Sequence, residues 1–501
     1  MTTGTTQTPR DVVRALPQAA REAFLERCAT LLEALDVTTA GVPSASLPDT
    51  VAATLTNACA DRVWLALAVL SARLPDIATT IEITRAVRLD GPALLLAHAI
   101  TTMDQDELAR VEIATGQTIV DVYQTARMPR STGIQRVSRQ LAREWAAHHD
   151  IRLVGWRDDQ TALIDLTADE RNHLLTDGLA PAPPPPGHRV TVVVPYRGRY
   201  LLPELAVGPQ LTPRLQGLAE YSRCRTGVVG FDCVPLTSAE TTHPGTPSHF
   251  VGNLAAVRHM DRIAAISRSA AAEYRGWRTM VGATGLRGPE ITGIPLPTEG
   301  VTPSAEALVE ARERFTIADM PLVLVVGTHE PRKNHEAVLH AAQLLWRKGH
   351  RFSLTFVGAD GWRSESFRVA LDDLQRAGLP LDSVSDLDED LLWAAYTVAH
   401  CTVFPSSNEG YGLPVAESIA VGTPAVTSAF GSMAEVAADG GAVLVDPRDD
   451  HAIADGIAQL LEDRELYASL VLEARRRPRR TWADYAAEVW AFLSTEGPAT
   501  D

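Results

Sequence analysis

The sequence is poor in the features that stabilise secreted proteins or anchor proteins in membranes. Its five cysteines are scattered and form no CxxC pair, which argues against a disulfide framework and against a zinc knuckle. The first residues, MTTGTTQTPRDVV, lack the apolar core of a signal peptide. No uninterrupted apolar run approaches the ~20 residues of a membrane-spanning helix. We therefore expect a reduced, cytoplasmic protein, and peripheral association with the inner face of a membrane stays open.

An excess of positive charge is also missing. The 501 residues carry a formal net charge of −16, which argues against broad electrostatic binding to nucleic acid or to an anionic membrane surface. A local basic pocket is still compatible with this charge. Apolar residues make up 45% and charged residues 22%, as in globular proteins, and the length is sufficient for two or three domains.

The periodicity of apolar residues divides the chain into four parts. Residues 1–115 are predicted to be a helical accessory region, because apolar side chains recur at three- and four-residue steps as far as about Ile113. Short β-rich runs alternate with amphipathic helices over residues 116–297 and again over 298–478. This alternation predicts an α/β protein with two doubly wound, mainly parallel sheets that face a common cleft. Residues 479–501 are predicted to contain a last helix.

The stretch NEGYGLPVAES, residues 408–418, predicts a binding site between a strand and a helix. Gly410 and Gly412 let the backbone approach a ligand, and the N-terminus of the following helix suits a diphosphate. Glu417 lies about one turn into the helix, where it can accept hydrogen bonds from a ribose diol, and Glu409 can bind sugar hydroxyls. An ordinary turn with surface glutamates accounts for the stretch equally well when it is taken alone.

A second stretch, VVGTHEPRKN, places two cations in a corresponding turn. A strand is predicted to end at Gly327, and Arg332 and Lys333 precede a helix that Asn334 can cap. Two cations at the carboxyl end of a strand can neutralise a leaving diphosphate, although basic residues in turns are often simply solvated. Because both stretches fall at equivalent strand ends of one domain, together they favour a binding site.

These stretches, with FVGADGW and GGAVLVDPRD, resemble the retaining GT-B glycosyltransferases of family 4, in their mannosyl- and rhamnosyltransferase-like branch. The likeness is dense over about 321–460, weaker over 118–297 and absent from the N-terminal helical region. It implies the GT-B fold, in which two tandem Rossmann-like domains face a cleft. It also implies that the last helix, within residues 479–501, crosses back to the first of these domains. The acids of the family's E-x7-E motif fall on Glu409 and Glu417.

The resemblance also implies roles for individual residues. Lys333 would bind the donor diphosphate with Arg332 beside it, Glu417 would hold the ribose, and Glu409 would hold the donor sugar. Glu409, Lys333, Arg332 and Asp232 form the implied catalytic group. The implied donor-binding residues are Gly327, Thr328, Arg332, Lys333, Glu409, Gly410, Tyr411, Gly412, Leu413, Glu417 and Gly133.

Two positions depart from the family's pattern. Many relatives have an arginine directly after the glycine that ends the strand, where this chain has Thr328. The family's acidic segment is often His-Asp, where this chain has Phe231 and Asp232. The histidine's role therefore does not carry over, and Asp232 is the candidate for orienting the acceptor or the donor, or else a turn cap. Gly133 stands where the family's first loop opens a helix that faces the diphosphate and the acceptor.

The implied activity is transfer of a sugar from a nucleotide diphosphate sugar, with GDP-mannose as the first choice, to a hydroxyl acceptor in bacterial glycan synthesis. No cofactor and no metal are expected, and the acceptor can be a glycan, a lipid-linked glycan or a protein. A GT-B epimerase or phosphorylase is an alternative. A different class is a non-catalytic nucleotide-sugar-binding platform, with the N-terminal helices serving partner contact or oligomerisation.

Two apparent metal motifs fit a metal site poorly. Asp386 and Asp388 have a DxD spacing, but Asp386 followed three residues later by Glu389 matches a helix capping box. His335 and His340 resemble a zinc-protease pair, but they lie five residues apart, whereas a helical zinc pair needs four.

Overall fold

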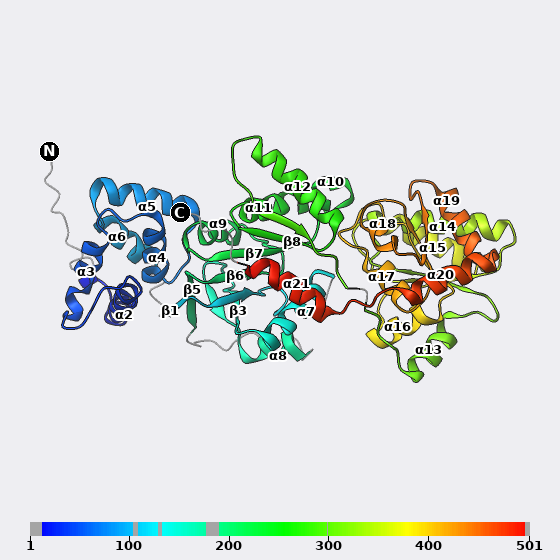
Figure 1. Cartoon of the computed structure of the whole chain (residues 1–501), viewed down its shortest axis with the longest axis horizontal. Helices are drawn as coiled ribbons and strands as arrows, with labels where there is room; N and C mark the ends of the chain where they lie inside the picture. The colour runs from blue at the N-terminus through cyan, green and yellow to red at the C-terminus, as the bar shows by residue number, and fades with distance from the viewer. Residues whose placement is uncertain (1–12, 104–108, 129–132, 177–189, 298, 496–501) are drawn as a thin grey trace.

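The computed structural model describes residues 13–103, 109–128, 133–176, 190–297 and 299–495. Its three parts follow one another along the long axis of the molecule (Figure 1). Helices occupy one end, a domain built on a nine-stranded sheet lies in the middle, and a domain built on a six-stranded sheet lies at the other end. None of the helices within these ranges is both long and apolar enough to cross a membrane.

The N-terminal helices pack around α4, in which Val63 to Ser71 are all buried. The bundle contacts the middle domain at strand β1 (Arg110–Thr115) and helix α9 (Leu211–Tyr221). It therefore lies on the side of this domain away from the C-terminal domain (Figure 1). Its helices are α2 (Gln18–Ala34), η1 (Ser44–Ser46), α3 (Leu47–Thr54), α4 (Ala60–Ser71), α5 (Ile77–Asp90) and α6 (Ala93–Thr102).

Strand β1 corrects the expected extent of the helical region, which the apolar pattern places as far as Ile113. The strand pairs in parallel with β5 (Thr191–Tyr196), and Val111 lies opposite Val192. The two-residue alternation of apolar side chains in this strand directly follows the helical pattern. The two patterns therefore merge in the sequence, although the turn at Gly116 separates β1 from the next strand.

The middle sheet has the order β1-β5-β4-β3-β2-β6-β7-β8-β9, and all its neighbours are parallel except β4, which runs antiparallel to β3 and β5. The remaining strands are β2 (Thr118–Asp121), β3 (Arg152–Trp156), β4 (Leu163–Asp165), β6 (Arg199–Leu202), β7 (Arg225–Gly230), β8 (Arg262–Ala265) and β9 (Glu290–Gly293). Its further helices are α7 (Gly133–His148), α8 (Ala168–Thr176), α10 (Val234–Thr237), η2 (Ala239–Thr241), α11 (Thr246–Val257) and α12 (Arg268–Gly282).

The C-terminal sheet is entirely parallel, with the order β12-β11-β10-β13-β14-β15. Strands β11 and β13 inside this sheet are buried at every position, as expected where helices cover both faces of a sheet. The strands are β10 (Leu322–Val326), β11 (Ser353–Val357), β12 (Leu381–Val384), β13 (Cys401–Phe404), β14 (Ala425–Ser428) and β15 (Ala442–Val445). The helices are α13 (Ala305–Phe315), η3 (Pro331–Lys333), α14 (His335–Arg347), α15 (Glu365–Arg376), α16 (Glu389–Val398), α17 (Leu413–Ala420), α18 (Gly431–Ala437), α19 (Asp450–Glu462) and α20 (Arg464–Arg476). The predicted fold class, two tandem α/β domains after a helical region, is confirmed.

The last helix, α21 (Trp482–Ser494), leaves the C-terminal domain and packs on α7, β7 and β8 of the middle domain (Figure 1, red). The indole N–H of Trp145 on α7 donates to the carbonyl of Ala486 at 3.0 Å. A capping box between Thr481 and Asp484 fixes where the helix begins. The two α/β domains are therefore joined both by the segment before α13 and by the segment before α21.

Two predicted helix caps are wrong. Helix α16 is capped by Asp388, whose side chain accepts a backbone N–H at 2.8 Å, and not by Asp386. The helix begins at Glu389, so Asp386 lies too far upstream to reach its first turn. Asn334 precedes α14 with a left-handed backbone, and its side-chain amide donates to the carbonyls of Pro405 and Pro447 instead of capping the helix.

Candidate active site

A cavity of about 400 Å³ lies between the two α/β domains. It opens at the carboxyl ends of β7, β8, β10 and β13, the edge where doubly wound sheets bind ligands. The middle domain contributes Gly133, Ile134, Val137, Phe231, Asp232, Ile266 and Leu296. The C-terminal domain contributes Gly327, Thr328, Glu330, Arg332, Lys333, Glu409, Gly410, Tyr411, Leu413 and Pro414. Most of the predicted site residues thus meet in one cavity, while Gly412 and Glu417 lie beside it.

The charged side chains of this cavity form a compact cluster around Glu409. The ammonium of Lys333 lies 2.6 Å from one Glu409 oxygen, and the guanidinium of Arg332 lies 2.5 Å from the other. Arg332 also pairs with Glu330 at 2.6 Å. Burial alone would raise the pKa of Glu409, but the charges of Lys333 and Arg332 overcome it and lower this pKa to about 2. Glu409 is therefore ionised at neutral pH and holds both cations at the cavity wall.

Backbone contacts between two loops fix the position of these cations. The carbonyl of Arg332 accepts the Ser407 backbone N–H at 2.9 Å and the Ser406 hydroxyl at 3.0 Å. In return, the Arg332 guanidinium donates to the carbonyl of Asn408 at 2.7 Å. The short helix η3 and the loop after β13 are thereby locked together, so the cations and Glu409 act as one preorganised unit.

Gly410 and Asp232 meet where the two domains touch. A Cβ atom on Gly410 would lie 2.8 Å from the Phe231 carbonyl and 2.8 Å from a carboxylate oxygen of Asp232, so only glycine fits. The hydroxyl of Ser267 donates to the Gly410 carbonyl at 2.7 Å. Asp232 also accepts the Val234 backbone N–H at 3.1 Å, so it caps a turn and lines the cavity at once. Its burial, partly offset by Arg332, raises its pKa to about 6.

Helix α17 begins at the cavity. Gly412 precedes it with φ 100°, a left-handed backbone that favours glycine, and Leu413 and Pro414 of the first turn line the cavity. The hydroxyl of Tyr411 donates to the Leu296 carbonyl of the middle domain at 2.8 Å. The positive end of the helix dipole, together with the two cations, provides an environment for an anion.

Glu417 is buried and paired across the domain boundary. One oxygen accepts the hydroxyl of Tyr396 at 2.9 Å, and the other forms an ion pair with Arg136 on α7. Sequence reasoning missed both partners. Arg136 lies three residues after Gly133 and therefore on the same face of α7, so the sequence alone could have indicated that Arg136 lies near the site. Residues 129–132 of the predicted first loop lie outside the described residues.

Within the described ranges, no group of three or more His, Cys, Asp and Glu side chains is arranged to hold a metal ion. His335 is buried, and burial together with His329 and Lys333 lowers its pKa to about 3. His340 pairs with Asp450 at 2.6 Å.

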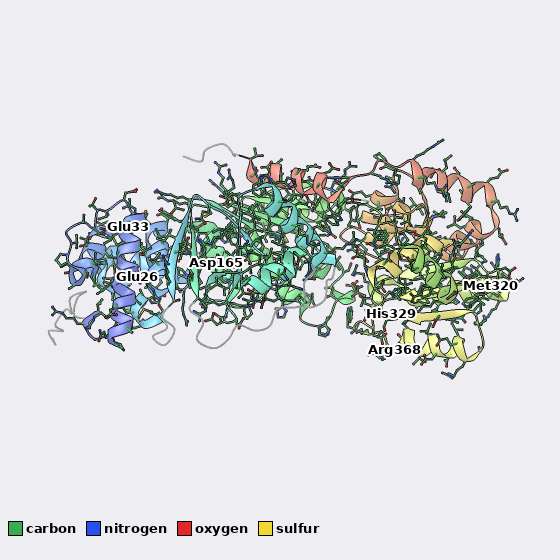
Figure 2. The ribbon with its side chains drawn as sticks, turned by 90° about the horizontal axis from the view of Figure 1, so that it is seen from below. Glu26, Glu33, Asp165, Met320, His329 and Arg368 are labelled. Atoms are coloured by element: carbon green, nitrogen blue, oxygen red, sulfur yellow. The ribbon has the colours of Figure 1, made fainter. Side chains whose placement is uncertain are left out.

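Figure 2 shows His329 and Arg368 in the C-terminal domain, at the opposite end of the molecule from Glu26 and Glu33 on α2.

Comparisons with known proteins find sequence similarity in the C-terminal part of the chain. Residues 310–477 match the family model described as glycosyl transferases group 1. The chain is 28% identical to the serotype-specific mannosyltransferase WbdA of Escherichia coli over 222 residues, which cover 42% of this chain and 26% of the relative. It is 36% identical over 152 residues to the O-antigen chain mannosyltransferase B of Escherichia coli, and these residues cover 30% of this chain and 39% of the relative. The chain thus spans well under half the length of these relatives.

Among solved structures, Anabaena HepE in complex with UDP and glucose superimposes with a TM-score of 0.55 at 13% identity, over 76% of this chain and 100% of that one. At this identity the likeness concerns the fold, which is GT-B. The chain therefore has the GT-B fold, and its residues 310–477 are similar to the glycosyl transferases group 1 family.

Proposed function

We propose that this protein is a retaining glycosyltransferase of family 4 that moves a sugar from a nucleotide diphosphate sugar to an acceptor hydroxyl. The observation that carries the proposal is the placement of Arg332 and Lys333 opposite the start of α17, in the cavity between the domains. The group 1 domain at residues 310–477 supports the same reaction class.

The difficult part of this reaction is the charge that develops on the leaving group. As the bond between C1 and the phosphate oxygen lengthens, negative charge grows on the diphosphate, where Arg332, Lys333 and the helix start stabilise it. A diphosphate competes with Glu409 for the two cations, and this competition frees Glu409 to accept hydrogen bonds from sugar hydroxyls. The acceptor oxygen bonds to C1 from the side the diphosphate leaves, and its proton passes to the departing phosphate oxygen.

GDP-mannose is the first donor to test. The names of the relatives, which are mannosyltransferases, support mannose as the transferred sugar. Glu417 would then bind the ribose after exchanging the Arg136 guanidinium for the ribose hydroxyls, since both of its oxygens have protein partners.

A donor screen tests the proposal. Purified protein is incubated with GDP-, UDP-, dTDP- and ADP-sugars without added metal, and the released nucleoside diphosphate and the donor dissociation constant are measured. We expect release from one donor class. Lys333→Ala should lower its rate by about 10²–10³-fold, the usual effect of losing one donor to a developing oxyanion.

Lys348→Ala is the matched control, because Lys348 is exposed beyond the end of α14 and should leave the rate unchanged. Proton NMR of the product reports whether the anomeric configuration is retained. Binding without release would favour a nucleotide-sugar-binding platform, and the absence of both binding and release would refute the site.

A further inference from the structure

A second cavity, of about 340 Å³, adjoins the first. Five residues line both cavities: Ile134, Phe231, Asp232, Glu330 and Arg332. A molecule in the second cavity would therefore lie directly beside one held by Arg332 and Lys333. This is the relation that an acceptor must have to a donor.

The remaining wall of the second cavity is largely apolar, with hydroxyl groups along it. It comes from the segment that contains α10, η2 and α11 and the loop after β6 in the middle domain, and from the loop between β11 and α15 in the C-terminal domain. The apolar residues are Leu205, Val234, Pro235, Phe250 and Trp362, and the polar ones are Thr241, Thr242, His243 and Thr246. Apolar and aromatic walls with a few hydrogen-bonding groups suit a small organic ligand.

Trp362 is held in place by its loop. The backbone N–H of Gly361 donates to the His329 carbonyl at 3.0 Å, and a Cβ atom on Gly361 would lie only 2.8 Å from that oxygen. Arg363 follows with a left-handed backbone, φ 54°, and its guanidinium lies over the Trp362 ring at 5.4 Å. The half-buried indole is therefore a fixed part of the cavity wall.

The charges around this cavity disfavour an anion. Asp232 and Glu330 line it, and Arg332 is the only lysine or arginine among the described residues that do so. Arg332 already forms ion pairs with Glu330 and Glu409. A phosphate group here would face the carboxylates of Asp232 and Glu330, and it would have to share Arg332 with the donor diphosphate in the neighbouring cavity. Desolvating a phosphate without a partner of its own is costly.

We propose that the second cavity is the acceptor subsite and that it takes a neutral sugar ring, with an apolar C–H face on the Trp362 indole and its hydroxyls toward the threonines. This proposal rests on the proposed glycosyl transfer, and it names the acceptor as an uncharged saccharide instead of a sugar phosphate. Aromatic faces attract the positively polarised C–H groups of such a ring and bury its apolar surface.

Saturation-transfer NMR tests the proposal directly, because it detects acceptor binding without turnover. The probes are the methyl glycosides of mannose, glucose, galactose and rhamnose, and mannose, glucose and galactose 6-phosphates. We expect saturation of ring protons in at least one neutral glycoside. Binding should weaken about tenfold in Trp362→Ala and be partly restored in Trp362→Phe, since an aromatic contact contributes roughly this much.

Val251→Ala is the control, because Val251 is next to Phe250 on α11 but is 54% exposed. It should bind the glycosides as the unchanged protein does. Tighter binding of the 6-phosphates, no saturation of any neutral glycoside, or equal binding by Trp362→Ala would overturn the proposal. Donor binding is measured on the same variants. Because Trp362 lies outside the donor cavity, Trp362→Ala should bind the donor normally. Loss of glycoside binding with normal donor binding concerns the acceptor subsite, whereas absence of donor binding in the unchanged protein would refute the proposed function.

Discussion

Glu409 shows how single residues prepare this site for an anion. It is bonded to both Lys333 and Arg332, and these charges keep its pKa near 2 although it is buried. The carboxylate keeps two like charges close together at a wall where they would otherwise repel each other. A diphosphate with greater negative charge can replace it without moving the cations, so little reorganisation is needed when the donor binds.

The buried carboxylate of Asp232, unlike that of Glu409, should destabilise the folded protein at neutral pH, because its pKa is raised and not lowered. Its pKa is raised to about 6 from an ordinary value of 3.8, so the folded protein holds a proton that the unfolded chain has released between these pH values. Its contribution is therefore least unfavourable below pH 3.8 and becomes more unfavourable as pH rises toward 6. We expect Asp232→Asn to be more stable than the unchanged protein at pH 7 by about 1–3 kcal/mol, and the difference to shrink as pH falls below 6.

Urea unfolding at several pH values measures this difference. Asparagine keeps the oxygen that accepts the Val234 N–H, so the turn itself is preserved. Asp319→Asn is the control, because Asp319 is an exposed residue that should change stability by less than about 0.5 kcal/mol at every pH. A constant difference between pH 4 and 7 for Asp232→Asn would contradict a raised pKa.

For single residues, the sequence predicted which side chains belong to the site better than it predicted which of them contact one another. Arg332, Lys333 and Glu409 are expected from the sequence to contact a substrate, but that they contact one another depends on two loops of different strands coming together. The spacing from Gly133 indicates that Arg136 lies near the site, but its pairing with Glu417 joins residues 281 positions apart, and a local pattern does not identify that partner. Asp388 capping α16 in place of Asp386 is a shift of two positions, a common error for a helix start.

Among the secondary-structure elements, the start of α17 has the strictest steric requirement. Gly410 packs against the Phe231 carbonyl and Asp232, so Gly410→Ala should force the two domains apart. We expect weaker donor binding and a lower unfolding temperature. Gly276→Ala on α12 is the matched control, since Gly276 lines neither cavity and a Cβ atom on it would have no other atom within 4 Å.

Calorimetry of both glycine variants, with and without donor, measures these effects. Alanine at position 276 also suits the helix better than glycine, so this variant should be at least as stable as the unchanged protein. Equal stability and equal donor binding in the two variants would show that the close approach at Gly410 is unimportant.

The strands that form distinct apolar runs were predictable from the sequence, including four-residue strands such as β13 and β14, whereas strands without such a run were not. The buried strands β10 and β11 are bounded apolar runs, and α14 has a clear helical period. Strands β4, β6 and β9 have three or four residues, too few to show an alternation, and they exist because neighbouring strands pair with them. Strand β4 is also antiparallel, which a simple βα alternation does not predict.

For the molecule as a whole, contacts across the cleft determine how closely the two domains approach. The ion pair between Arg136 and Glu417 is one such contact, and Asn408 donates to Thr237 and Ser238 across the same boundary. We expect Arg136→Gln to loosen the pair and raise the radius of gyration measured by small-angle X-ray scattering without donor. Glu144→Gln, which lies further along α7, should leave the scattering unchanged.

An unchanged radius of gyration in Arg136→Gln would mean that other contacts suffice to hold the domains.

The position of the N-terminal helices is also a property of the whole molecule, and the sequence left the role of these helices open. The described residues 13–103 contribute no side chain to either cavity, and the bundle packs on β1 and α9 at the other end of the middle domain. The helices of residues 13–103 therefore do not contact an acceptor bound in either of these two cavities.

The ion pair of Lys333 has a practical consequence for following this protein in solution. The chain contains only two lysines, Lys333 and Lys348. Reductive methylation with ¹³C-formaldehyde would label just these two side chains and the N-terminus of a 54.0 kDa protein. The Lys333 ammonium lies 4.9 Å from the centre of the Phe404 ring, which shifts its methyl resonance away from that of exposed Lys348. A donor that displaces Glu409 should move one resonance and leave the other as an internal reference, so occupancy of the cavity becomes readable from a spectrum of three signals.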